Sequence, residues 1–144
     1  MKTRVYTGGT FDILHAGHVN FLRKIKGLFP DCFLIVSLNT DEFIKEYKGI
    51  PPIFNYEERK SQLYMLGLVD IVIQNIGGAD SKPAIENGRP DIIAIGTDWL
   101  KKDYCKQMGF TPEWLENKKI NLIYIPYTKE VSTTMIKERI KNAR

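Results

Sequence analysis

The stretch GGTFDILHAGH, residues 8–18, decides the fold because it joins a short apolar segment to a long amphipathic one. The segment before it, TRVYTG (3–8), has the length and composition of a buried strand. Over residues 18–29, apolar side chains repeat at helical spacing and basic side chains fall on the opposite face. We therefore expect a strand, a glycine-rich loop and a helix in succession, which is the opening unit of a parallel α/β sheet.

The rest of the chain alternates between strands and helices in the same way. Four further apolar runs predict strands that are covered on both faces: 32–38, 70–75, 91–96 and 121–126. Helices are predicted between and after them, over residues 40–48, 56–67, about 80–88 and from Ser132 onward. The region between the last two strands is irregular, apart from a helix start at Thr111 and Pro112. This alternation predicts a doubly wound, parallel five-stranded sheet with helices on both faces.

Composition limits the functions that remain open. The chain has 144 residues, of which 43% are hydrophobic and 26% charged, and it lacks repeats, so we expect one globular domain. Its two cysteines, Cys32 and Cys105, are too few for a disulfide framework or a four-cysteine zinc site. We see no signal peptide or membrane-spanning stretch, and expect a cytoplasmic protein. The scattered net charge of +4 disfavours nucleic acid as a partner and suits a small anionic substrate.

Three interpretations are open for His15 and His18, which lie three residues apart among Gly8, Gly9 and Gly17. Zinc is disfavoured, because zinc-binding histidines on a helix are spaced i, i+4 and no third ligand is nearby. Two buried structural histidines would leave the glycines unexplained. Glycines allow a polyanion to approach backbone amides at a helix start, where partial positive charge favours phosphate. We therefore interpret the stretch as a phosphate-binding site, with no metal ligands of its own.

The sequence His15-Ala16-Gly17-His18 resembles the HxGH site of the nucleotidyltransferase superfamily, and more narrowly that of the cytidylyltransferase family. Three further blocks resemble this family in the same order: YEERK (56–60), IGTDW (95–99) and STTMIK (132–137). The resemblance therefore covers nearly the whole chain. It implies a single nucleotidyltransferase domain over residues 1–144, with a Rossmann-like sheet. It also implies transfer of a nucleotidyl group from a nucleoside triphosphate to a phosphorylated alcohol, with release of pyrophosphate.

The chemistry implied by this resemblance needs no nucleophile from the protein. A phosphate monoester has a second pKa near ~6 and is a dianionic nucleophile at neutral pH. The protein must align two anions and stabilise charge on the α-phosphate and the pyrophosphate. His15 and His18 are expected to donate hydrogen bonds to that charge. Lys48 and Arg59 are the other catalytic candidates by resemblance, the alternatives being a solvated lysine and a surface salt bridge.

The resemblance also assigns residues to the ligands. The nucleotide-binding candidates are Gly9, Thr10, Phe11, Asp12, His15, His18, Gly96, Asp98, Ser132, Thr133 and Thr134. The acceptor-binding candidates are Asp41, Trp99 and Tyr127. Asp12 is a candidate for ordering the loop or for holding Mg²⁺ through water, with a purely structural cap as the alternative. Simple capping of its helix is the alternative for Ser132. Mg²⁺ is expected to enter as a cofactor together with the nucleotide.

Two departures from the family members that act on glycerol 3-phosphate bear on the substrate. Gly67 and Tyr127 stand where those members carry arginines, and Lys129 is a candidate replacement for one of them. The first departure is shared with adenylyltransferases that act on a heptose phosphate. We expect CTP and a small phosphorylated alcohol as substrates, with ATP and a sugar phosphate as the alternative. A non-catalytic nucleotide-binding module is the third interpretation, and we expect a homodimer.

The segment 100–119 has no counterpart of this length in the glycerol 3-phosphate members. Because it follows Asp98 closely, we expect its beginning to lie over the mouth of the site. It would then offer cations and an aromatic face to the acceptor through Lys101, Lys102, Tyr104 and Lys106. The alternatives are an ordinary surface excursion or a contact between subunits.

Overall fold

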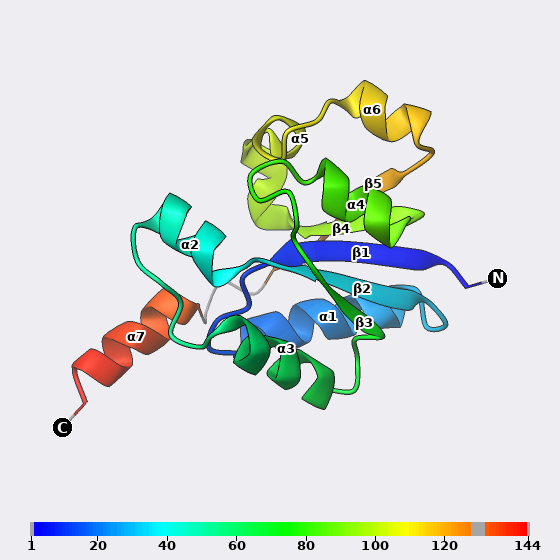
Figure 1. Ribbon diagram of the computed structural model, residues 1–144. Coiled ribbons are helices and arrows are strands. Elements are labelled where there is room, and N and C mark those ends of the chain that lie inside the picture. The colour runs from blue at the N-terminus through cyan, green and yellow to red at the C-terminus, as the bar shows by residue number, and fades with distance from the viewer. Residues whose placement is uncertain (1, 128–131, 144) are drawn as a thin grey trace.

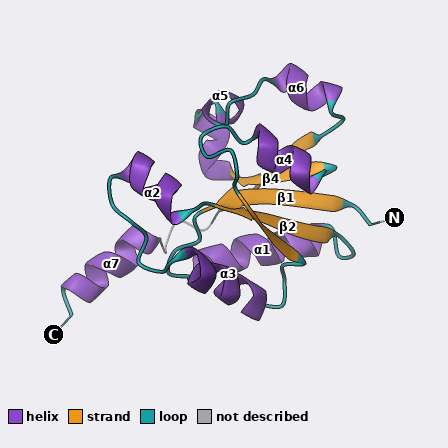
Figure 2. Ribbon diagram, viewed as in Figure 1, coloured by secondary structure: helices purple, strands orange, loops and turns teal. Residues whose placement is uncertain are grey.

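The described residues form one parallel sheet with the spatial order β3-β2-β1-β4-β5 (Figures 1 and 2). The computed structural model describes residues 2–127 and 132–143. The strands are β1 (Arg4–Gly9), β2 (Phe33–Leu38), β3 (Ile71–Gln74), β4 (Ile92–Gly96) and β5 (Asn121–Ile125). Each boundary lies within one residue of the predicted range. The doubly wound, five-stranded sheet predicted from the sequence is thereby confirmed.

Helices cover both faces of this sheet (Figure 1). One face carries α1 (Ala16–Leu28) and α3 (Tyr56–Met65). The other carries α4 (Lys82–Gly88), α5 (Tyr104–Gln107) and α6 (Pro112–Asn117). Beyond the carboxyl ends of the strands lie α2 (Asp41–Lys48) and α7 (Thr133–Lys141). None of the helices within the described ranges is both long and apolar enough to cross a membrane.

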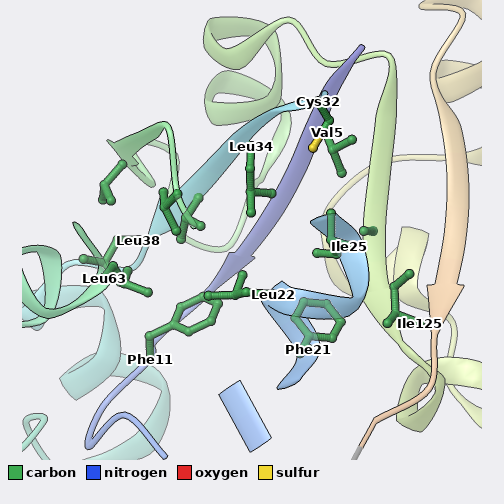
Figure 3. Close-up of a cluster of buried hydrophobic side chains, with 14 residues drawn as sticks. Val5, Phe11, Phe21, Leu22, Ile25, Cys32, Leu34, Leu38, Leu63 and Ile125 are labelled. Atoms are coloured by element: carbon green, nitrogen blue, oxygen red, sulfur yellow. The ribbon is translucent and has the colours of Figure 1, made fainter. Parts of the chain in front are cut away.

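The core beneath the sheet anchors the loop that follows β1. On α1, Phe21, Leu22 and Ile25 are buried because the apolar residues fall on one side of the helix. They pack in one cluster with Leu38 of β2 and with Phe11, which belongs to the loop itself (Figure 3). Full burial of such side chains stabilises the fold by ~1.5–3 kcal/mol each. The loop therefore starts from a firmly packed base.

The segment 100–119 forms a layer of the second core, over β4 and β5. It begins in the 3-10 helix η1 (Thr97–Lys101) and continues through α5 and α6. As predicted, Thr111 caps α6 and Pro112 occupies its first turn. Its buried side chains pack in one cluster with the strands, and they are Tyr104, Cys105, Phe110 and Leu115. This burial excludes an ordinary surface excursion.

The topology creates a crevice beside β1. From this central strand, the chain adds β2 and β3 on one side and β4 and β5 on the other. Parallel α/β sheets bind ligands where the order of strands reverses, beyond their carboxyl ends. The loop carrying the glycines and histidines leaves β1 at that point. The fold therefore places this loop where a ligand site is expected.

Candidate active site

A cavity of about 500 Å³ lies beyond the carboxyl ends of the strands. Its walls come from the β1–α1 loop, from residues that follow β2, β3 and β4, and from α2 and α5. Several residues predicted to bind ligands line it together: Gly9, Thr10, Phe11, His18, Gly96, Asp98, Trp99 and Tyr127. Residues from three separate stretches of the sequence therefore meet in one place.

The two histidines form a reciprocal cap at the start of α1. The Nδ1 atom of His15 accepts from the backbone N–H of Gly17 at 3.0 Å. The Nδ1 atom of His18 accepts from the backbone N–H of His15 at 3.3 Å. The two rings stack, with centroids 3.8 Å apart. Because each Nδ1 is an acceptor, each neutral ring carries its proton on Nε2, and His18 lines the cavity with that donor available.

The surroundings keep these histidines neutral. The pKa of His18 is lowered to about 4, mainly by burial and also by the neighbouring His15, while the Asp12 carboxylate acts in the opposite direction. Burial also lowers the pKa of His15. His15 lies behind His18 and does not line the cavity, so the structure places one of the two predicted phosphate donors at the cavity surface.

Arg59 faces the protein interior and not the cavity. Its Nε donates to the carbonyl of Phe54 at 2.9 Å, and its Nη1 donates to the carbonyl of Thr10 at 2.9 Å. Its Nη2 pairs with Oδ1 of Asp41 at 2.7 Å. The Arg59 side chain is 0% exposed. Arg59 and Asp41 thus satisfy each other in this structure, and the expected contacts of Arg59 with phosphate and of Asp41 with the acceptor stay predictions.

Asp12 has a structural role of the same kind. Its two carboxylate oxygens accept from the backbone N–H groups of Ile53 and Phe54, at 2.7 and 3.0 Å. Asp12 is buried and does not line the cavity, which fits the structural alternative, and its contact with the nucleotide stays a prediction. Asp12, Asp41 and Arg59 together hold the β1–α1 loop against the α2–α3 connection, and we call these three residues the loop clip.

The end of β4 forms another part of the cavity wall. Gly96 ends this strand, and a Cβ there would collide with the carboxylate of Asp98 and approach Tyr127. Glycine is therefore required for this close approach. Burial, with a contribution from Asp98, raises the pKa of the Tyr127 phenol. Asp98 is the one carboxylate among the described residues that line the cavity.

A family model described as cytidylyltransferase-like matches residues 6–139. The chain belongs to the cytidylyltransferase-like family. It is 34% identical to glycerol-3-phosphate cytidylyltransferase of Staphylococcus aureus over 138 residues, covering 95% of this chain and 94% of that protein. It is 38% identical to FAD synthase of Pyrococcus horikoshii over 145 residues, covering 96% and 93%.

Among solved structures, a lipopolysaccharide core biosynthesis protein from Thermoplasma volcanium matches with a TM-score of 0.68 and 27% identity. That match covers 90% of this chain and 100% of the other. These comparisons confirm the predicted family and the Rossmann-like fold. Since the two relatives are named for different reactions, membership of the cytidylyltransferase-like family leaves the donor and the acceptor open.

The lysines predicted to take part in catalysis or in acceptor binding do not line the cavity of this cytidylyltransferase-like protein. Lys48 is exposed at the end of α2, with its Nζ 5.7 Å from the ring centroid of Tyr47, which does line it. Lys101, Lys102 and Lys106 are also exposed and lie outside the lining. Tyr104 from the same segment does line it, as expected. The segment therefore presents an aromatic face to the cavity, and the expectation that it presents cations there is wrong.

The last family block lies beside the loop and not in the cavity lining. Ser132 is the N-cap of α7, its Oγ accepting from the N–H of Met135 at 3.1 Å. The Thr133 hydroxyl donates to the carbonyl of Asp12 at 2.9 Å, which ties the start of α7 to the β1–α1 loop. Thr134 is exposed. Phosphate binding by these residues stays a prediction, and Lys129 lies outside the described residues.

Several residues that the sequence reasoning missed also line the cavity. Asn39 and Asn75 directly follow β2 and β3, Phe43 and Tyr47 come from α2, and Gln107 comes from α5. The two asparagines had a usable signal, because residues just after parallel strands gather at the ligand-binding edge of the sheet. The α2 and α5 residues had none, since their orientation depends on how these short helices pack.

Proposed function

We propose that the protein transfers a cytidylyl group from CTP to the phosphate of a small phosphorylated alcohol. The observation that carries this proposal is the His15–His18 cap, which leaves the Nε2–H of His18 free at a cavity floored by the glycines of β1. A neutral imidazole with a fixed tautomer is a preorganised hydrogen-bond donor for developing phosphate charge. The cytidylyltransferase relative that spans nearly the whole chain supports CTP as the donor.

In the proposed reaction, an oxygen of the acceptor phosphate attacks the α-phosphorus of the nucleotide. A new P–O bond forms while the bond between the α-phosphorus and the bridging oxygen to the β-phosphate breaks, and pyrophosphate leaves. His18 donates from Nε2 to the charge that builds up on the transferring group. His15 positions His18 by stacking and by its backbone N–H. No protein base is needed, because the acceptor phosphate is already ionised at neutral pH.

Mg²⁺ is proposed to arrive bound to the triphosphate. Within the described ranges, no group of three or more histidine, cysteine or acidic side chains is arranged to hold a metal ion. Mg²⁺ is commonly held by one or two carboxylates together with substrate phosphates, and Asp98 offers one such carboxylate at the cavity. The cavity lining therefore suits an Mg²⁺ ion that enters with the nucleotide and neutralises its phosphate charge.

A second candidate function is adenylyl transfer from ATP to flavin mononucleotide, which would yield FAD. The FAD synthase relative supports this candidate, at 38% identity over 96% of the chain. So does the aromatic character of the lining, which includes Phe43, Tyr47, Trp99 and Tyr104. Such side chains suit a flat heteroaromatic body.

Pyrophosphate release tests both candidates. The protein with Mg²⁺ is incubated with each of the four nucleoside triphosphates, and with either glycerol 3-phosphate or flavin mononucleotide. Release with CTP and glycerol 3-phosphate supports the first candidate, and release with ATP and flavin mononucleotide supports the second. Nucleotide binding by calorimetry without release with any acceptor would instead indicate a binding module. His18→Ala serves as the control for contaminating activity.

A further inference from the structure

The wall formed by residues that follow β2 and β3 has no part in the phosphate chemistry proposed above. Asn75 follows β3, is 8% exposed and lines the cavity. Its Nδ2 donates to Oδ1 of Asn39 at 2.8 Å and to the carbonyl of Gly78 at 3.0 Å. Its Oδ1 is buried and has no hydrogen-bond partner among the residues the structure describes. Buried amide oxygens without a partner are rare, because they have lost water and gained nothing.

The orientation of this amide is fixed by its neighbours. Turning it over would set its oxygen against the oxygens of Asn39 and Gly78, which are acceptors only. Asn75 orients Asn39 in turn, because Oδ1 of Asn39 accepts from it, and the Nδ2 of Asn39 then donates to Oγ1 of Thr10 at 3.1 Å. Oγ1 of Thr10 also lies 3.0 Å from the hydroxyl of Tyr47. The free oxygen of Asn75 is thus held in place by a chain of hydrogen bonds that runs to the β1–α1 loop.

The same wall carries no charge. Neither lysine nor arginine occurs among the described residues that line the cavity. The carboxylate of Asp98 follows β4, on the other side of β1 from Asn75. A charged group placed beside Asn75, Phe43 and Tyr47 would lose water without gaining an opposite charge.

We propose that Asn75 selects the acceptor, whose body is uncharged and presents an N–H or O–H group to Oδ1 of Asn75. This inference rests on the proposed function and on the prediction from the sequence that Gly96 and Asp98 bind the nucleotide. The acceptor then places its phosphate near His18 and its body between the ends of β2 and β3. Polyol phosphates and flavin mononucleotide, with its imide N–H, belong to this class. Aminoalkyl phosphates and phosphorylated carboxylic acids do not.

The test compares small acceptors that differ in the charge of the body. Pyrophosphate release is measured with glycerol 3-phosphate, phosphoethanolamine and 3-phosphoglycerate, with flavin mononucleotide as a larger neutral acceptor, each with CTP and with ATP. For wild type, kcat/KM for a neutral acceptor should exceed that for both charged ones by on the order of 100-fold.

Asn75→Asp then tests the residue itself. The added carboxylate should lower kcat/KM for neutral acceptors and raise it for phosphoethanolamine, shifting their ratio by about 10-fold or more. The KM for the nucleotide should not change. Gln74→Ala removes an amide from the preceding, exposed position, which does not line the cavity, and should behave as wild type.

Two results would overturn the inference while leaving nucleotidyl transfer in place. One is a wild-type preference for a charged acceptor. The other is an Asn75→Asp variant whose kcat/KM falls by the same factor for every acceptor, or does not change, since a structural role would have that effect. If no acceptor releases pyrophosphate with either nucleotide, the proposed function fails and this inference fails with it.

Discussion

The loop clip and the cavity wall use polar side chains in opposite ways. In the clip, the charged groups of Asp12, Asp41 and Arg59 are all turned toward protein partners. In the wall, the neutral side chains of His18 and Asn75 each keep an atom free beside the cavity. A buried charge without a partner is far more costly than a buried neutral group without one. The three charged residues of the clip therefore build the scaffold, whereas the neutral His18 and Asn75 line the cavity together with the carboxylate of Asp98.

The largest effect is expected from breaking the clip at Asp41. Asp41→Ala leaves the fully buried guanidinium of Arg59 without its counter-charge, and should lower the free energy of unfolding by about 3 kcal/mol. This value is at the low end for buried pairs because the Asp41 side chain is 36% exposed. Urea unfolding measures the change, with Glu46→Ala on the exposed face of the same helix as the control. A loss below about 1 kcal/mol would show that the clip is not a scaffold.

His18→Ala should lower the reaction rate strongly and change the stability of the fold little, in contrast to Asp41→Ala. Loss of one preorganised donor typically lowers kcat by ~10²–10³, whereas the free energy of unfolding should change by about 1 kcal/mol or less. His18→Gln keeps an N–H near the position of Nε2 and should retain more activity than alanine. Steady-state kinetics and urea unfolding of both variants separate the two effects. An active His18→Ala variant would contradict the assignment of His18 to the cavity wall.

A further effect should appear in the pH dependence of stability. The pKa of His18 is about 4 in the folded protein and 6.5 when unperturbed, so the unfolded state binds more protons between these values. Stability should therefore fall as the pH is lowered from about 6.5 to about 4, and His18→Gln should lessen this slope. Unfolding free energies across this window measure it, together with NMR titration of the ring. A ring that titrates near 6.5 would refute the neutral, capped state.

The smallest effect is expected outside the cavity. Lys101→Ala combined with Lys102→Ala should change the KM of the acceptor by less than about 2-fold, because both lysines are exposed and neither lines the cavity. Gln107→Ala, a change in the lining from the same segment, should raise that KM several-fold. The reverse order of effects would mean that cations reach the acceptor and that the contrast between clip and wall does not extend to α5.

The sequence predicted the sheet because its strands are continuous apolar runs, such as FLIVSL in β2, separated by amphipathic helices. It missed two features of the helices. α1 begins at Ala16, two residues earlier than expected, because His15 takes the place of a conventional cap. α5 spans only Tyr104–Gln107, and so short a helix has too few residues to show a periodicity.

The location of the site could be predicted from the sequence, but the orientations of its side chains could not. The HAGH and GTDW blocks lie at the ends of β1 and β4, so topology brings them together. Whether Arg59 points into the cavity or into the protein depends on where Asp41 and the carbonyl of Thr10 lie, and these are tertiary contacts. The free oxygen of Asn75 depends likewise on Asn39 and Gly78 occupying its amide nitrogen.

In the proposed function, the cap that joins His15 to His18 holds the phosphate donor within the first turn of α1. The same atoms that begin α1 also choose which ring nitrogen carries the proton, so neither can be lost alone. Helix ends open far more often than whole domains unfold. Each opening of this first turn releases both rings to exchange tautomers and rotate, while the sheet beneath stays intact. In the proposed function, local opening of this turn would therefore stop the reaction without unfolding the sheet, so activity would depend on the end of one helix as well as on the stability of the fold.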